Sequence, residues 1–154
     1  PDAVLLSVGG GGLLCGVAQG MRRNQWDEVP LVAVETHGAD SMAQSIAAGE
    51  RVQLPALTSI ATSLSASLVC EEAFEWTRRR PVRPVVVSDL EALEACERFL
   101  DDQRVAVEPA CGASLAAGYA GVSELADFDT VLVVVCGGVT ASLEQIQDWS
   151  AQLA

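Results

Sequence analysis

The feature that most constrains the fold is a run of four glycines, Gly9 to Gly12, directly behind a short apolar segment, Ala3 to Val8. Such a segment predicts a buried β-strand, and the pattern of Leu13 to Arg23 predicts the helix that follows it. A strand that leads at once into a helix begins a βαβ unit, the connection that parallel strands require. We therefore expect an α/β protein with the glycines at the carboxyl end of a strand.

Short apolar runs and longer helical patterns alternate along the rest of the chain. The expected strands are Leu31 to Glu35, Val85 to Val87 and Val131 to Cys136. The last of these should be covered on both faces, because all its residues are apolar. The expected helices are Asp40 to Ala48, Glu71 to Arg79, one that begins at Ser88, Pro109 to Ala126, and Ser142 to Leu153. Residues 1–154 then form a single α/β domain, a three-layer sandwich with a mostly parallel sheet.

Two local signals refine this outline. Ser88 and Glu91 have the spacing of a capping box, in which each side chain bonds the backbone N–H of the other residue. The segment Arg51 to Ser67 is rich in serine and threonine, and we expect a loop there with one helical turn.

Charge and cysteine content exclude several classes of function. The net charge is −12, and the nine basic residues are all arginines, which cannot easily supply a stripe that neutralises nucleic-acid phosphates. No apolar stretch is long enough to span a membrane. The five cysteines form no Cys-x-x-Cys pair, and the single histidine has no partner at ligand spacing. We expect a cytoplasmic protein with neither nucleic-acid nor membrane partners.

Three alternatives arise for the glycine run. A P-loop is excluded because the chain contains no lysine. A dinucleotide fingerprint needs a further glycine where Leu14 or Cys15 stands, although Glu35 ends the second strand where a ribose-binding acid would lie, so this alternative stays open. A turn required only for close packing also stays open. Four glycines best suit a compact phosphate group bound by backbone N–H groups at a helix start.

Five segments, taken in order, carry a family resemblance. They are Ser7 to Leu13, Val34 to Ala39, Leu54-Pro55 with Thr58 to Ala61, Val107 to Ala113, and Val135 to Gly138. Together they resemble the C-terminal half of the L-serine/L-threonine dehydratases, which are pyridoxal-phosphate enzymes of fold type II with the tryptophan-synthase-β-like fold. The resemblance runs from the first residue to the last. It implies that this domain is part of the large domain of such an enzyme.

The resemblance implies a role for seven residues at the cofactor. Gly9, Gly10, Gly11 and Gly12, with Leu13, would hold the phosphate of pyridoxal phosphate through main-chain N–H groups. Cys136 would face the pyridine nitrogen, with Gly137 beside it. A neutral thiol there leaves the nitrogen largely unprotonated, which suits elimination of a hydroxyl group. The alternative for Cys136 is a small buried apolar residue.

The family also implies a monovalent cation, K⁺, near the phosphate loop. The matching ligands are the carboxylate of Glu35 and four backbone carbonyls, those of Gly9, Ala39, Leu64 and Ala66. Oxygen ligands of this kind suit a hard cation. The alternative for Glu35 is that it caps a neighbouring helix.

The segment Glu108 to Ala113 resembles a strand-to-helix turn with Pro109 at the helix start. We expect it to place the last helices without taking part in the chemistry.

Two catalytic elements of the family lie in its N-terminal half, namely the Schiff-base lysine and the Ser-x-Gly-Asn loop that binds the substrate carboxylate. Neither is in this chain, so no catalytic residue is assigned to it. Because the chain enters its first strand directly after Pro1 and Asp2, we expect it to be a piece of a longer protein.

The resemblance implies a lyase that converts L-serine (or L-threonine) to pyruvate (or 2-oxobutanoate) and ammonia. This piece should be inactive alone. The implied partners are the amino-acid substrate, the missing N-terminal half and a second copy in a homodimer. The alternatives are a relative of serine racemase, threonine deaminase or cysteine synthase, and a non-catalytic phosphate- or nucleotide-binding domain.

Overall fold

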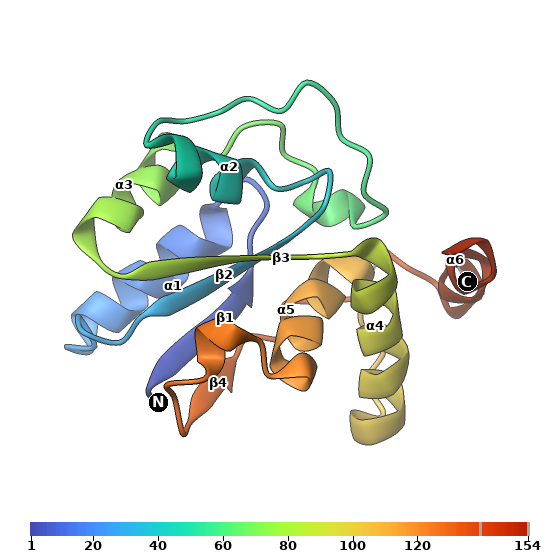
Figure 1. Cartoon of the computed structure of the whole chain (residues 1–154). Coiled ribbons are helices and arrows are strands. Elements are labelled where there is room, and N and C mark those ends of the chain that lie inside the picture. The colour runs from blue at the N-terminus through green and yellow to red at the C-terminus, as the bar shows by residue number, and fades with distance from the viewer. Residues whose placement is uncertain (139, 154) are drawn as a thin grey trace.

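The computed structural model describes residues 1–138 and 140–153. Its centre is a parallel sheet of four strands in the order β3-β2-β1-β4 (Figure 1). The strands are β1 (Ala3–Ser7), β2 (Leu31–Thr36), β3 (Val82–Val87) and β4 (Val131–Val133). Every residue of β1 and β2 is buried, as expected for parallel strands covered on both faces.

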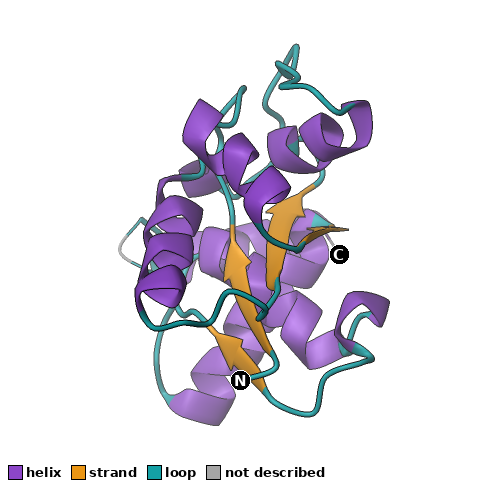
Figure 2. Cartoon of the chain, turned by 90° about the vertical axis from the view of Figure 1, so that its left-hand side faces the viewer, coloured by secondary structure: helices purple, strands orange, loops and turns teal. Residues whose placement is uncertain are grey.

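Helices cover both faces of the sheet, which confirms the predicted α/β class (Figures 1 and 2). One face carries α1 (Gly12–Arg23), α2 (Ser41–Ala48) and α3 (Glu71–Arg79). The other carries α4 (Asp89–Gln103) and α5 (Pro109–Ala120), and α6 (Leu143–Leu153) packs on α4. Side chains of β1 alternate between the two cores, since Val4 and Leu6 face α1 while Ala3 and Leu5 face α5.

Helix boundaries follow their capping chemistry. The capping box of α4 is confirmed, because the Ser88 hydroxyl accepts the Glu91 N–H at 3.1 Å and the Glu91 carboxylate accepts the Ser88 N–H at 2.7 Å. The expectation that the helix from Pro109 extends to Ala126 is wrong. It ends at Ala120, because Gly121 adopts a left-handed conformation with φ of 59° that stops the helix.

Two strand predictions also need correction. β3 begins at Val82, earlier than expected, and it includes Pro84, which an edge strand tolerates because one side of it needs no N–H donor. The expected strand Val131 to Cys136 is only three residues long. It is not covered on both faces, since Leu132 is 47% exposed. Within the described residues β4 pairs with β1 alone, so it forms an edge of the sheet.

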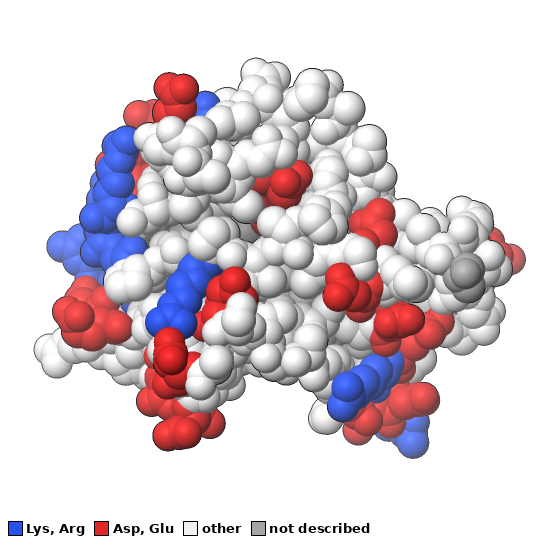
Figure 3. All heavy atoms as spheres, viewed as in Figure 1, with Lys and Arg blue, Asp and Glu red and all other residues white. Residues whose placement is uncertain are grey.

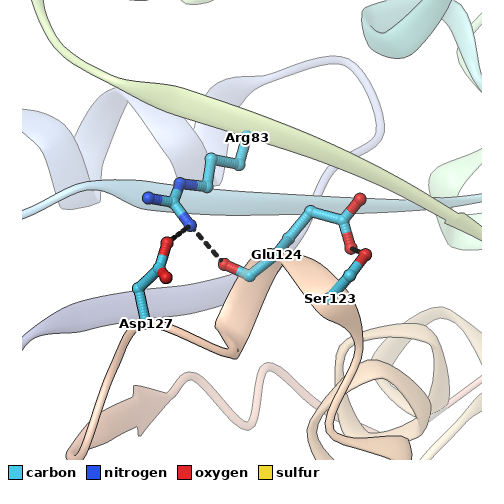
Figure 4. Close-up of polar contacts among 4 residues, drawn as sticks. All are labelled: Arg83, Ser123, Glu124 and Asp127. Atoms are coloured by element: carbon cyan, nitrogen blue, oxygen red, sulfur yellow. Dashed lines mark hydrogen bonds and ion pairs between the residues drawn. The ribbon is translucent and has the colours of Figure 1, made fainter.

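Loop segments are tied to the sheet by side chains. The long loop contains one 3₁₀ turn, Thr62–Leu64, as predicted, and Asp89 anchors the loop by accepting the Ile60 N–H at 3.0 Å. A second segment, the one that follows α5, is tied to β3 by Arg83. The Arg83 guanidinium donates to the Glu124 carbonyl at 2.8 Å and pairs with the Asp127 carboxylate at 3.3 Å (Figure 4).

Charge is unevenly distributed over the surface. In the view of Figure 3, acidic residues are scattered, while arginines gather at the edge formed by α1 and α3. These are the basic residues in the last turns of the two helices, Arg22, Arg23, Arg78 and Arg79. They lie at the opposite end of α1 from the glycines. Across the described ranges, no helix combines the length and apolar character needed to cross a bilayer.

Candidate functional site

The order of the strands determines where a ligand can bind. From β1 the chain proceeds to β2 and β3 on one side, then returns through α4 and α5 to β4 on the other side of β1. In open parallel sheets, ligands bind outside the carboxyl ends of the strands at the point where the direction of winding reverses. Here that point lies between the carboxyl ends of β1 and β4.

A cavity of about 310 Å³ opens at this reversal point. It brings together six of the seven predicted cofactor residues, which come from segments far apart in the sequence: Gly9, Gly10, Gly11, Gly12, Leu13 and Cys136. The seventh, Gly137, is not part of the lining, but its carbonyl accepts the Glu108 N–H at 3.2 Å beneath the cavity wall.

The four glycines serve two different purposes. A Cβ atom on Gly9 would lie 2.9 Å from the Cα atom of Leu64, and one on Gly11 would lie 2.4 Å from the Ala73 Cβ. Close packing therefore requires glycine at these two positions. A Cβ on Gly10 would make only an ordinary contact, and one on Gly12 would meet nothing within 4 Å. Close packing alone thus explains half of the run, and it does not require glycine at the other two positions.

The start of α1 supplies hydrogen-bond donors to the cavity. The Cys15 N–H bonds the Gly11 carbonyl at 3.0 Å, so the N–H groups of the residues before it have no partner within the helix. Gly11 has no side chain with which to cap them. Among residues 1–138 and 140–153, no arginine lines this cavity. An anion here would be bound by backbone N–H groups and the positive end of the helix dipole. This geometry fits the phosphate of the predicted cofactor.

Cys136, which follows β4, lines the same cavity as the start of α1. It is exposed, which argues against the alternative of a small buried apolar residue. Its backbone N–H donates to the sulfur of Cys111 at 3.3 Å. A thiol that is accessible at the wall and fixed through its backbone is suited to contact a ring in the cavity.

Sequence reasoning missed several lining residues, namely Ser63, Glu108 and Ala110. Glu108 was expected only to place the last helices. Its carboxylate also accepts the Thr140 N–H at 3.2 Å, which ties the segment after β4 to the start of α5. The sequence could have identified Glu108 as a lining residue, because it directly precedes Pro109, where α5 begins. Nothing in the loop sequence around Ser63 identifies that residue.

Glu35 is the one side chain among the predicted cation ligands. Its two carboxylate oxygens accept the N–H groups of Met42 at 2.8 Å and Ala43 at 2.7 Å, so Glu35 does cap α2, the alternative weighed for it. A carboxylate oxygen has more than one acceptor site, so capping leaves room for a cation. Gly9 contacts Leu64, and Gly10 lies near Ala66. Ala39, also buried, precedes α2. Cation binding at these residues stays a prediction.

Glu35 makes the cation prediction testable through pH. Burial raises its pKa from 4.5 to about 7, opposed by the two N–H bonds and helped by the negative charge of Asp40. Since one pKa unit corresponds to about 1.4 kcal/mol, ionising Glu35 in the folded chain costs on the order of 3 kcal/mol. The folded state therefore binds the proton more tightly than the unfolded state, and stability falls as the pH rises from 4.5 through about 7.

A cation beside Glu35 would offset this loss. We expect K⁺, compared with choline at equal ionic strength, to raise the free energy of unfolding more at pH 8 than at pH 5.5, as measured by urea titration. Glu35→Gln, which cannot ionise, should flatten the pH dependence and remove the K⁺ increment. The site would be refuted if K⁺ raised the free energy of unfolding equally at both pH values. It would also be refuted if the Gln variant kept the K⁺ increment of the parent chain.

Fold and cavity together define an α/β protein with a glycine-lined cavity at the reversal point of a parallel sheet. The family model of the pyridoxal-phosphate dependent enzymes matches residues 1–137, and the chain belongs to this family. It is 44% identical to the L-serine dehydratase/L-threonine deaminase of Rattus norvegicus, over 99% of this chain and 44% of that protein. It is 47% identical to a serine dehydratase-like protein of the same species, over 99% of this chain and 49% of that protein.

Solved structures agree with this assignment. A fungal L-serine ammonia-lyase from Rhizomucor miehei superimposes with a TM-score of 0.94 at 35% identity, covering 100% of this chain and 50% of that one. Maize serine racemase gives a TM-score of 0.81 at 28% identity, covering 99% of this chain and 48% of that one. The chain thus spans about half the length of the relatives it matches.

Proposed function

We propose that this chain is the C-terminal part of a pyridoxal-phosphate-dependent L-serine (L-threonine) dehydratase, and that it supplies the phosphate cradle and the ring-nitrogen partner of the active site. The observation that carries the proposal is the single cavity in which the glycine loop after β1 meets Cys136 after β4. The similarity to L-serine dehydratases along nearly the whole chain supports it.

Each side of the cavity has a task in this proposal. The N–H groups at the start of α1 hold the phosphate, and Gly10 and Gly12 leave room for it. The Cys136 thiol, a weak hydrogen-bond donor, contacts the pyridine nitrogen without protonating it fully. The bound cofactor would supply an electron-withdrawing ring for elimination of the substrate hydroxyl. The chain has no lysine to bond the cofactor covalently, so we expect it to produce no pyruvate from L-serine by itself.

The remaining half of the protein, which would carry that lysine, needs a docking surface. β4 offers an unpaired edge among the described residues, and next to it lies an apolar cavity of about 470 Å³. Leu115, Phe128 and Val133 are among its lining residues. Exposed apolar surface of this kind marks interaction sites. We propose that the missing half covers this face.

Ligand binding to the chain tests the phosphate cradle. Pyridoxine 5′-phosphate is a suitable probe, because it has the ring and phosphate of the cofactor but no aldehyde to react with amines. We expect it to raise the melting temperature of the chain, whereas pyridoxine and NAD⁺ should not. Pyridoxal phosphate itself should bind weakly and without the absorption band of a lysine-linked cofactor.

A charge change in the cradle separates binding from folding. Gly12→Asp places an acid in the first turn of α1, which stabilises a helix by about 0.3–1 kcal/mol but repels a phosphate. We expect it to fold at least as well as the parent and to lose the response to pyridoxine 5′-phosphate. Gly20→Asp adds the same charge where no atom lies near, and it should keep the response. A response to NAD⁺ with none to the phosphate probe would favour a nucleotide-binding domain instead.

A further inference from the structure

Behind Cys136 lies a second cysteine whose surroundings are unlike those of the other thiols. Cys111 is completely buried in the first turn of α5. Its sulfur accepts the Cys136 N–H at 3.3 Å. The side chains of Cys111 and Cys136 are close enough to influence each other's ionisation. One buried sulfur thus holds the backbone at Cys136, three residues after β4 ends at Val133.

The charge in this pair belongs on Cys111. A backbone N–H donor and a helix start stabilise a thiolate, and Cys111 has both, while Cys136 does not lie at a helix start. Hydrogen bonding, first from the Cys136 thiol and then from the backbone, lowers the pKa of Cys111 to about 6. The same contact, followed by burial, raises the pKa of Cys136. Two other groups face the pair, Cys96 from α4 and Glu108 from the start of α5, and neither offers a positive charge.

We propose that Cys111 is a positioning residue for the ring-nitrogen site, because its sulfur fixes the backbone of Cys136 and keeps the Cys136 thiol protonated. The inference rests on the proposed function only in naming the ring as the occupant of the cavity. A protonated thiol matters there, because a thiolate would repel the lone pair of an unprotonated pyridine nitrogen. A protonated Cys136 thiol can donate to Cys111 or, when a ring is bound, to its nitrogen.

Alkylation of Cys136 tests this role without any catalytic readout. Iodoacetamide reacts with the thiolate, so its rate at Cys136 against pH, read by mass spectrometry of the digested chain, reports the ionisation of that thiol. Exposed Cys70, which lies outside the cavity lining, is the reference in the same digest. We expect Cys136 to react roughly tenfold or more faster at pH 8.5 in Cys111→Ala than in the parent chain.

A second variant separates anchoring from charge. Cys111→Ser retains an acceptor for the Cys136 N–H but cannot ionise near neutral pH. It should restore thermal stability lost in Cys111→Ala, yet leave Cys136 as reactive as in that variant. If both variants lower the melting temperature and the alkylation profile of Cys136 stays that of the parent, the role is structural only and the proposal is wrong.

The proposed function fails in a different way. Pyridoxine 5′-phosphate should protect Cys136, but not Cys70, from alkylation in the parent chain. If the probe gave no protection but the Cys111 variants showed the expected alkylation profiles, the ring would be rejected as the occupant of the cavity. The coupling of the two thiols would still stand.

Discussion

Gly112→Ala should destabilise the chain by at least about 3 kcal/mol, at or beyond the upper end of typical overpacking costs. A Cβ atom at this position would lie 2.0 Å from the Ala92 carbonyl oxygen and 2.6 Å from the Cys96 sulfur. The carbonyl belongs to the backbone of α4 and cannot turn aside, so α4 and α5 would have to separate. Urea unfolding followed by circular dichroism measures the loss.

The matched control is Gly16→Ala. Gly16 is exposed in α1, and a Cβ there would meet no atom within 4 Å. Alanine should stabilise the helix by about 0.5–1 kcal/mol relative to glycine. If both substitutions changed the free energy of unfolding alike, close contact between α4 and α5 at Gly112 would be disproved.

Gly11→Ala should have the second largest effect, a loss of roughly 2–4 kcal/mol. Gly11 has φ of 93°, where a side chain costs about 1–2 kcal/mol, and its added Cβ would lie 2.4 Å from the Ala73 Cβ of α3. Both terms act on the folded state, so the loss should appear in urea unfolding without any ligand.

Gly10→Ala is the control for this position. Its Cβ would lie 3.7 Å from the Ala66 Cβ, an ordinary contact, and we expect stability within about 0.5 kcal/mol of the parent. A loss at Gly10 as large as that at Gly11 would show that all four glycines are required by packing, and it would remove the argument that two of them are kept for a ligand.

Local patterns predicted the elements of this fold well. The apolar run before the glycines forms β1, Ser88 and Glu91 form the expected capping box, and Pro109 begins α5. Each of these depends on residues within a few positions of one another. Boundaries were predicted less well where a turn conformation decided them, as at Gly121, whose left-handed conformation ends α5.

The candidate site, like the fold, could be predicted only where its residues are close together in the sequence. The place of the glycine loop could be predicted, because a strand, four glycines and a helix start are contiguous in the sequence. Cys136 entered only through a resemblance to a family, and Glu108, Ser63 and Cys111 were not predicted as parts of the site. Their contacts join segments far apart along the chain, and no local period reports such contacts.

By itself, then, the sequence determined that a glycine run at a helix start follows the first strand, and it predicted a phosphate site there because backbone donors and room for a ligand are both local properties of such a run. Only the tertiary structure decided what that site faces. The chain returns to place β4 beside β1, so the cavity opens between their carboxyl ends with Cys136 in its lining. Strand order results from the packing of helices on both faces of the sheet, which depends on the whole chain at once.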